Sequence, residues 1–225
     1  MLQLLDILIF SYLTLPFCFI IAKGKIRERF LLLLAIYGIV FFSLLFFHDW
    51  VPKDIKKYRQ AFYTFLEYST FTYIFWVNIK NKLFKKFVVI VSVLFILFQF
   101  YYVTNTRPQK LDSIPIGIET IFIFIYIFYF FYDFSKNVKD TFLYNHYCFW
   151  LSVGILIYLG GSFFFYILAN NLGDKEVEIF EKVTYVTEII KNLLFCIAIF
   201  LYKKFPANNV HNHSKNIPNL DMHVI

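Results

Sequence analysis

Long apolar segments alternate with short polar ones along the whole chain, and this pattern predicts the fold class. The apolar segments are about 17 to 22 residues long, which is the length at which a helix crosses the hydrocarbon core of a bilayer. They cover residues 2–22, 30–47, 61–79, 87–103, 116–134, 147–168 and 183–202. We therefore expect an all-α integral membrane protein, with a bundle of seven transmembrane helices that forms one domain over residues 1–204.

The composition agrees with a chain in a lipid environment. Hydrophobic residues make up 60% of the sequence and charged residues 16%, and the mean hydropathy is +0.62. Soluble domains contain roughly 45–50% apolar and about 25% charged residues, so the composition argues against a soluble fold. The formal net charge of +7 requires no nucleic-acid partner, because the cytoplasmic loops of membrane proteins collect Lys and Arg. The partner that the composition implies is the lipid bilayer.

The distribution of Lys and Arg predicts the orientation. With the N-terminus outside, the cytoplasmic regions hold 13 of the 22 basic residues and the outside regions hold 8, while Lys191 lies within a segment. The positive-inside rule therefore favours N-terminus out and C-terminus in. Residues 205–225 then form a polar cytoplasmic tail, which we expect to be disordered. His211 and His213 in this tail are a weak metal-binding signal, and we expect neither a metal site nor a cofactor.

Four acidic residues and one lysine lie within the apolar segments toward the ends that the predicted orientation places outside, whereas Asp133 lies near the inner end of segment 116–134. Glu188 and Lys191 are three positions apart, so they share one helix face. With the N-terminus outside, the acids lie about 4–9 Å below the outer boundary at 1.5 Å per residue, and they are Asp6, Glu67, Glu119 and Glu188. Charged groups in a membrane usually face a partner or a cavity. We therefore expect these residues to meet inside the bundle at one depth.

This set of charges predicts an acidic pocket that faces the outside. Four ionised carboxylates and one ammonium group would carry a net charge of −3, which is unfavourable at low dielectric. Either some carboxyl groups hold a proton, or water or a cation fills the space between them. Threonines three positions before and after Glu67 extend its helix face. The residues expected to bind a ligand are Glu67, Glu119, Glu188, Lys191, Thr64 and Thr70.

A structural interpretation of the same residues stays open. An ion pair between Lys191 and either Glu67 or Glu188 can fix the register of neighbouring helices without any ligand. Glu119 can instead be solvated near the membrane interface. In both cases the charges would support the fold and would have no direct role in binding.

Segment 147–168 contains several small residues, among them Gly154, Gly160, Gly161 and Ser162. Gly160 and Gly161 predict a flexible point at which the helix could bend during a conformational switch. The alternative is that these small residues let a neighbouring helix approach closely.

Three stretches carry a resemblance to known proteins: FYTFLEYSTFTYIFW (62–76), FWLSVGILIYLGGSFFFYIL (149–168) and EIIKNLLFCIAIFLYKK (188–204). They resemble a family of uncharacterised short seven-helix bacterial inner-membrane proteins. The family's glutamate in the first stretch corresponds to Glu67. Its pattern in the second, Phe-Trp followed by Ser-x-Gly-x-Leu-Ile-Tyr-x-x-Gly, is carried by Phe149, Trp150, Ser152, Gly154, Leu156, Ile157, Tyr158 and Gly161.

The resemblance implies a location in the bacterial inner (plasma) membrane. It also implies a signalling role, because relatives often occur beside short sensor histidine kinases. Relatives often carry a His early in the last segment, where this chain has none, so any shared chemistry of a pocket does not carry over directly.

These features predict a sensing or ligand-binding module that signals through a cytoplasmic partner such as a histidine kinase. The first alternative is a small proton- or cation-coupled transporter, which carboxyl groups within a membrane would suit. Further alternatives are a membrane-embedded lipid hydrolase and a rhodopsin-like protein. A hydrolase with a zinc site needs three converging protein ligands, which the sequence does not assemble, so no catalytic residue is assigned. Rhodopsins place an Asp four residues before the lysine, whereas Glu188 lies three before Lys191.

Overall fold

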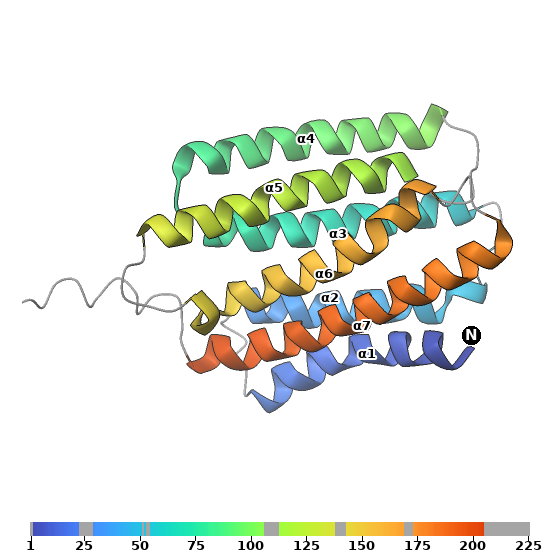
Figure 1. The fold of residues 1–225 in the computed structure, drawn as a ribbon, viewed down its shortest axis with the longest axis horizontal. Coiled ribbons are helices and arrows are strands. Elements are labelled where there is room, and N and C mark those ends of the chain that lie inside the picture. The colour runs from blue at the N-terminus through green and yellow to red at the C-terminus, as the bar shows by residue number, and fades with distance from the viewer. Residues whose placement is uncertain are drawn as a thin grey trace, which may run out of the picture.

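The computed structural model describes residues 2–22, 29–50, 52, 55–105, 113–137, 143–168 and 173–204. In these ranges the regular secondary structure is all helical (Figure 1), with seven α-helices and two short 3-10 helices, η1 and η3. They are α1 (Leu2–Ile21), α2 (Arg29–Phe46), η1 (His48–Trp50), α3 (Lys56–Asn78), α4 (Lys82–Asn105), α5 (Ser113–Asn137), η3 (Leu143–Asn145), α6 (Tyr147–Leu168) and α7 (Asp174–Lys204). The predicted all-helical fold with seven long helices is confirmed. The expected polar tail, 205–225, lies outside the described residues.

Five of these helices are long and apolar enough to cross a membrane, by length and composition. They are α1, α2, α4, α5 and α7, and α6 contributes a shorter apolar stretch, Tyr147–Phe163. Helix α3 begins with a basic first turn that includes Lys56, Lys57 and Arg59. Five such helices in one chain indicate a membrane protein.

Helix α7 begins well before the predicted apolar segment. The apolar segments 147–168 and 183–202 predict a connecting loop over residues 169–182. This prediction is wrong from Asp174 onward, because α7 includes the four acidic residues that follow Gly173. Acidic side chains stabilise the first turns of a helix, whose N-terminus carries a partial positive charge. The Glu176 carboxylate accepts the backbone N–H of Gly173 at 3.0 Å, as in one half of a capping box. Hydropathy alone therefore locates the start of this helix too late.

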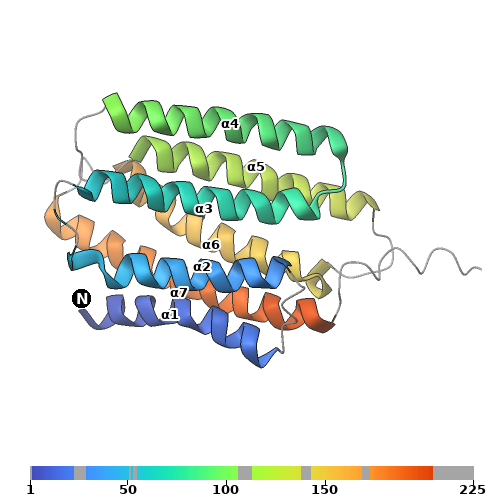
Figure 2. The ribbon, with the colours of Figure 1, turned by 180° about the vertical axis from the view of Figure 1, so that it is seen from behind.

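Helices that are neighbours in sequence also pack together, and α7 closes the arrangement. It lies between α1 and α6, while α5 packs against both α6 and α3 (Figures 1 and 2). Helix α2 packs mainly on α1 and contacts α3. Helix α4 lies at the edge of the bundle and packs mainly on α3 and α5 (Figure 2). Helix α7 therefore packs on α1 on one side and on α6 on the other.

The outer surface of the bundle is more apolar than that of a soluble protein. Helix α4 exposes a nearly continuous apolar surface made of Leu83, Phe87, Val89, Ile90, Val93, Leu94, Ile96, Leu97, Phe100 and Tyr101. Such a large exposed apolar face is rare on a soluble monomer. Polar groups instead point inward: Gln99 of α4 is buried and donates to the backbone oxygen of Ala61 on α3 at 2.7 Å. The outer surface therefore suits a lipid environment.

Pro16 and Gly38 define the contact between α1 and α2. Pro16 lies inside α1 and has no N–H to donate to the carbonyl of Tyr12, four residues earlier. The last part of α1 bends away from its first half in Figure 2, as a proline within a helix leads one to expect. A Cβ added at Gly38 of α2 would lie 2.6 Å from that Tyr12 oxygen. Gly38 thus lets α2 approach the point at which the hydrogen bonding of α1 is interrupted.

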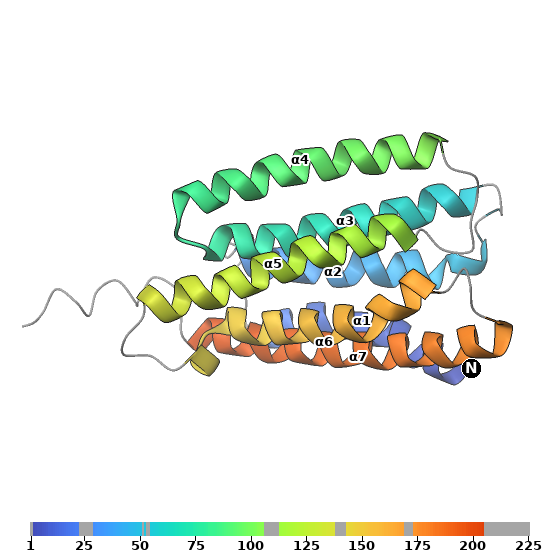
Figure 3. The same cartoon turned by 45° about the horizontal axis from the view of Figure 1, so that its top comes forward.

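Helix α6 approaches α7 closely at two of its glycines. A Cβ at Gly154 would lie 3.4 Å from the backbone oxygen of Lys191, and one at Gly161 would lie 2.6 Å from a methyl group of Thr187. A Cβ at Gly160 would meet no atom within 4 Å. These distances favour close packing at Gly154 and Gly161. The last turns of α6 turn away from α7 (Figure 3), and the flexible point at Gly160 and Gly161 stays a prediction.

Candidate functional site

A fully buried lysine lies between two carboxylates from different helices. Lys191 of α7 has an exposed fraction of 0%, and its Nζ lies 3.5 Å from Oε1 of Glu188, one turn earlier on the same helix. The same Nζ lies 3.7 Å from Oε1 of Glu67 on α3. Both glutamates are 4% exposed. The three sequence-predicted charges are therefore brought together in the interior.

Tyrosine hydroxyl groups complete the polar contacts of these charges. Nζ of Lys191 donates to the hydroxyl oxygens of Tyr37 at 2.9 Å and Tyr12 at 3.3 Å. Glu188 Oε1 accepts hydrogen bonds from Tyr12 and, at 2.8 Å, from Tyr63. Glu67 Oε2 accepts one from Tyr158 at 3.1 Å. We call this set the Lys191 cluster: Lys191, Glu67, Glu188, Tyr12, Tyr37, Tyr63 and Tyr158.

Aromatic rings enclose the ammonium group of Lys191. Its Nζ lies 4.1 Å from the ring centroid of Tyr158, 5.3 Å from Tyr12, 5.5 Å from Tyr37 and 5.7 Å from Phe71. Desolvated cation–π contacts contribute about 2 kcal/mol or more each in favourable geometry. The ammonium group is thus stabilised by rings as well as by carboxylates.

The glycines of α6 explain how Tyr158 reaches the cluster. Gly154, Tyr158 and Gly161 follow one another at intervals of four and three residues, so they lie on one helix face. Close approach at the two glycines brings this face against α7, where the Gly154 position meets the backbone of Lys191. The small residues of α6 therefore position a tyrosine ring over the lysine.

Glu119 of α5 is buried beside the cluster without a comparable set of partners. Its exposed fraction is 1%, and it lies close enough to Glu67 and Lys191 to interact with both electrostatically. No hydrogen-bond donor reaches its Oε1. The alternative interpretation, in which Glu119 is solvated near the membrane interface, is wrong, because the side chain is buried. Asp6, which was expected at the same depth, has an exposed side chain and lies outside the cluster.

The two predicted threonines lie on the same face as Glu67 but have different surroundings. Thr64 is buried, whereas Thr70 is half-buried and donates to the backbone oxygen of Leu66 at 2.8 Å. A further buried polar contact joins α7 to α1, where Asn192 donates to Oγ of Ser11 at 2.7 Å. Whether either threonine binds a ligand stays a prediction.

The cluster lies near the middle of the helices and is closed to solvent. Glu67 is the central residue of α3 (Lys56–Asn78), and Lys191 lies close to the centre of α7 (Asp174–Lys204). The sequence places both residues nearer to one end, because charged first turns hide the true starts of α3 and α7. With exposed fractions between 0 and 4%, the four charged residues do not line an open pocket in this structure.

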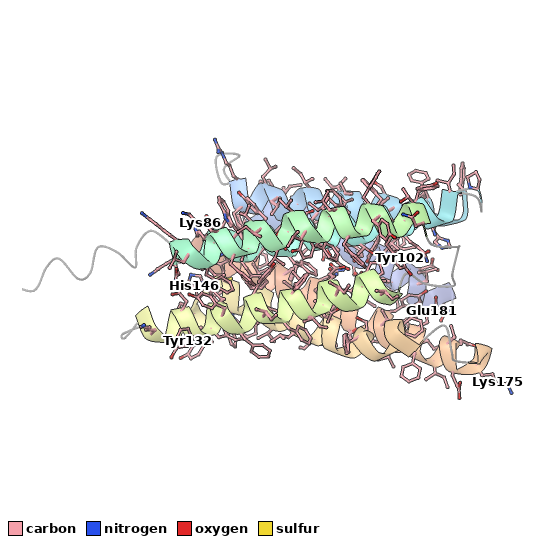
Figure 4. All side chains as sticks on the ribbon, turned by 90° about the horizontal axis from the view of Figure 1, so that it is seen from above. Lys86, Tyr102, Tyr132, His146, Lys175 and Glu181 are labelled. Atoms are coloured by element: carbon pink, nitrogen blue, oxygen red, sulfur yellow. The ribbon has the colours of Figure 1, made fainter. Side chains whose placement is uncertain are left out.

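His146 lies far from this cluster, at the opposite end of the bundle from Glu181 (Figure 4). Its Nδ1 accepts the backbone N–H of Cys148 at 3.3 Å, and its ring stacks on Tyr147. Burial, together with the positive charge of Lys80, lowers the pKa of His146 to about 4. Its imidazole is therefore neutral at neutral pH. Within the described ranges, no group of three or more His, Cys, Asp or Glu side chains could hold a metal ion.

Sequence reasoning missed the tyrosines, which supply most of the hydrogen bonds in the cluster. The chain has 17 of them, and nothing in a list of Tyr residues separates Tyr12 and Tyr37 from the rest. One signal was present: both lie well inside their apolar segments, whereas membrane proteins concentrate Tyr at the interfaces. A hydroxyl group at that depth needs a partner.

No known protein family, curated protein or solved structure matches this chain. The resemblance to short seven-helix bacterial inner-membrane proteins stays a prediction, and the site is interpreted from its own geometry.

Proposed function

We propose that this protein is a sensing module of a bacterial inner membrane, in which the Lys191 cluster is the switch that a stimulus resets. The observation that carries the proposal is the set of contacts around one ammonium group. Lys191 is held by side chains of α1, α2, α3 and α6 as well as by its own helix, α7. A change in charge at this point alters the packing of five helices at once.

Buried charges suit a switch because their energy depends strongly on pairing. A protonation event or a bound cation that weakens the contact of Lys191 with Glu67 would favour a different packing of α3 against α7. Packed helices change between discrete arrangements rather than deforming continuously. A cytoplasmic partner such as a histidine kinase would then respond to the helix ends on its side of the membrane.

The proposal places the N-terminus outside and the C-terminus in the cytoplasm. Figure 4 separates the two ends of the bundle: Lys86 and His146 lie at one, and Tyr102, Lys175 and Glu181 at the other. The first of these ends also carries Lys80 and Lys82, both exposed. An excess of basic residues is expected on the cytoplasmic side.

Cysteine labelling in intact cells tests this orientation. In a background with Cys18, Cys148 and Cys196 replaced, we expect Gly173→Cys to react with a membrane-impermeant maleimide from outside. Lys82 begins α4 at the end of the bundle that the proposal places in the cytoplasm. We expect Lys82→Cys to react only after permeabilisation. The reverse pattern would overturn the orientation, and equal protection of both sites until lysis would argue against a chain that spans the membrane.

Hydrogen–deuterium exchange tests the switch itself in the full chain, reconstituted in liposomes. Glu67→Gln removes one charge from the cluster with little change in shape. We expect it to alter deuterium uptake at the far helix ends, over residues 78–86 and 143–150, because α3 and α6 run from the cluster to these positions. The control is Glu178→Gln, which removes an exposed charge paired with Lys182 at 2.9 Å. If uptake changes only beside residue 67, the cluster fixes helix register and transmits nothing.

A proton- or cation-coupled transporter is the second candidate, and one observation favours it. Glu119 is a third buried carboxyl group beside two others that share one ammonium group. Carriers use such groups to bind the coupling ion. Uptake of substrate into proteoliposomes driven by a pH gradient, and lost in Glu119→Gln, would favour this function over sensing.

The rhodopsin-like alternative has one supporting contact, between Lys191 of α7 and Glu67 of α3. To bind retinal as a Schiff base, Lys191 would have to leave both carboxylates and the four rings that enclose it. A visible absorption band after addition of retinal would support this alternative. The lipid hydrolase gains no support from the described residues.

A further inference from the structure

We infer that Glu119 is the proton-binding residue of this site, and that it holds its proton inside the bundle at neutral pH. The inference deepens the proposed function, on which it rests, by naming a proton as the species that the switch binds.

Two of the three glutamates have the partners that an ionised carboxylate needs. Glu188 receives hydrogen bonds from two tyrosines and lies 3.5 Å from Nζ of Lys191. Glu67 receives one from Tyr158 and lies 3.7 Å from the same Nζ. Hydrogen bonds and a nearby opposite charge both favour the charged form of a carboxyl group.

Glu119 lacks these partners although it is more deeply buried. Its exposed fraction is 1%, compared with 4% for each of the others, and its Oε1 receives no hydrogen bond. Oε1 of Glu67 receives none either, but that oxygen lies 3.7 Å from Nζ of Lys191, and Oε2 of Glu67 accepts the Tyr158 hydroxyl. The charged and titratable groups that interact with it from neighbouring helices are Glu67 on α3, Lys191 on α7 and Tyr37 on α2. A negative charge on Glu67 opposes a second one on Glu119.

Within the described residues, no second buried cation neutralises Glu119. Among the side chains that the structure describes, Lys191 is the one fully buried lysine or arginine, and two carboxylates and two tyrosine hydroxyls already share it. An isolated carboxylate in a low-dielectric interior costs so much free energy that the group takes up a proton instead. The third carboxyl group is therefore neutral.

A divalent metal ion is a poorer occupant than a proton. Calcium takes six to eight oxygen ligands and magnesium about six. The described part of the chain contains no group of three or more His, Cys, Asp or Glu side chains that could hold a metal ion. A proton needs one oxygen atom, and Glu119 offers one that is buried and unbonded. Protonated Glu119 can then exchange its proton with Glu67 when the stimulus moves α3 or α5.

Infrared difference spectroscopy of the purified full chain tests this inference. A protonated carboxyl group has a carbonyl stretch separated from the bands of a carboxylate. At neutral pH we expect wild type to show one such band from a buried group, and Glu119→Gln to lose it. Glu119→Asp, which keeps the acid, should keep a band at a shifted frequency. Glu178→Gln, at an exposed carboxylate, should leave the spectrum in this region unchanged.

Two results would overturn the assignment. If wild type shows no such band, Glu119 is ionised and a cation or water must accompany it, which a titration with sodium or potassium ions would then detect. If the band survives in Glu119→Gln and disappears in Glu67→Gln, the proton belongs to Glu67. The readout needs no signalling partner, so a band lost in Glu119→Gln together with unchanged deuterium uptake at the far helix ends would refute the sensing role alone.

Discussion

Replacing Lys191 with methionine is expected to destabilise the folded bundle by about 3–5 kcal/mol, the range seen when one partner of a buried ion pair is removed. The methionine side chain fills a similar volume, so the loss comes from charge. Glu67 and Glu188 would keep only their tyrosine hydrogen bonds in an interior from which water is excluded. The measurement is the free energy of unfolding in detergent micelles, determined by denaturant titration.

Lys182→Met is the matched control for this prediction. Lys182 is also on α7 and also forms an ion pair, with Glu178 at 2.9 Å, but both side chains are nearly half exposed (45% and 49%). Exposed ion pairs contribute about 0.2–1 kcal/mol, so we expect a small effect. Equal losses in the two variants would contradict the buried position of Lys191.

Alanine at Gly38 is expected to cost about 1–3 kcal/mol, the usual range for an overpacked interior. The new Cβ would lie 2.6 Å from the Tyr12 oxygen and 3.0 Å from side-chain atoms of Leu15 and Pro16. The oxygen belongs to the backbone, so it cannot turn aside as the end of a side chain can. α1 and α2 would have to separate, and Tyr12 and Tyr37, which meet at the lysine, would move apart. Thermal unfolding of the variant in detergent checks this result.

Gly160→Ala provides the comparison, because the same change there meets open space. Alanine in a helix interior is favoured over glycine by about 1 kcal/mol. We therefore expect Gly160→Ala to keep or raise the unfolding temperature while Gly38→Ala lowers it. A Gly38→Ala variant as stable as wild type would show that α1 and α2 are less closely packed than the structure describes.

The helical fold could be predicted from the sequence because seven apolar segments of membrane-spanning length leave few alternatives. The ends of the helices could not. α3 and α7 begin with charged residues outside the apolar stretches. The first turns of α7 are acidic, which the helix dipole favours, and Glu176 accepts the backbone N–H of Gly173. α3 begins with Lys56 and Lys57 and has no side-chain hydrogen bond at its N-cap. The sequence also gives no distance between helices that are far apart in the chain. The pairing of α7 with α1 depends on such contacts.

The charged part of the site was predictable for a different reason. Charges are so costly within an apolar segment that Glu67, Glu188 and Lys191 stand out, and the need for partners places them together. Asp6 shows the limit of this argument, since an acid near a helix end can face solvent. Tyr12 and Tyr63 were hidden because Tyr is common in this chain and its role depends on rotation of the helix about its axis.

A double-mutant cycle between Lys191 and Glu67 tests the central claim, that a charge on α7 is paired with one on α3 inside the bundle. The free energy of unfolding is measured for wild type, Lys191→Met, Glu67→Gln and the double variant under one set of conditions. We predict a coupling energy of about 0.5–3 kcal/mol, with the double variant losing less stability than the two single losses added together. A coupling energy of zero would contradict the claim, because the two residues would then contribute to stability independently.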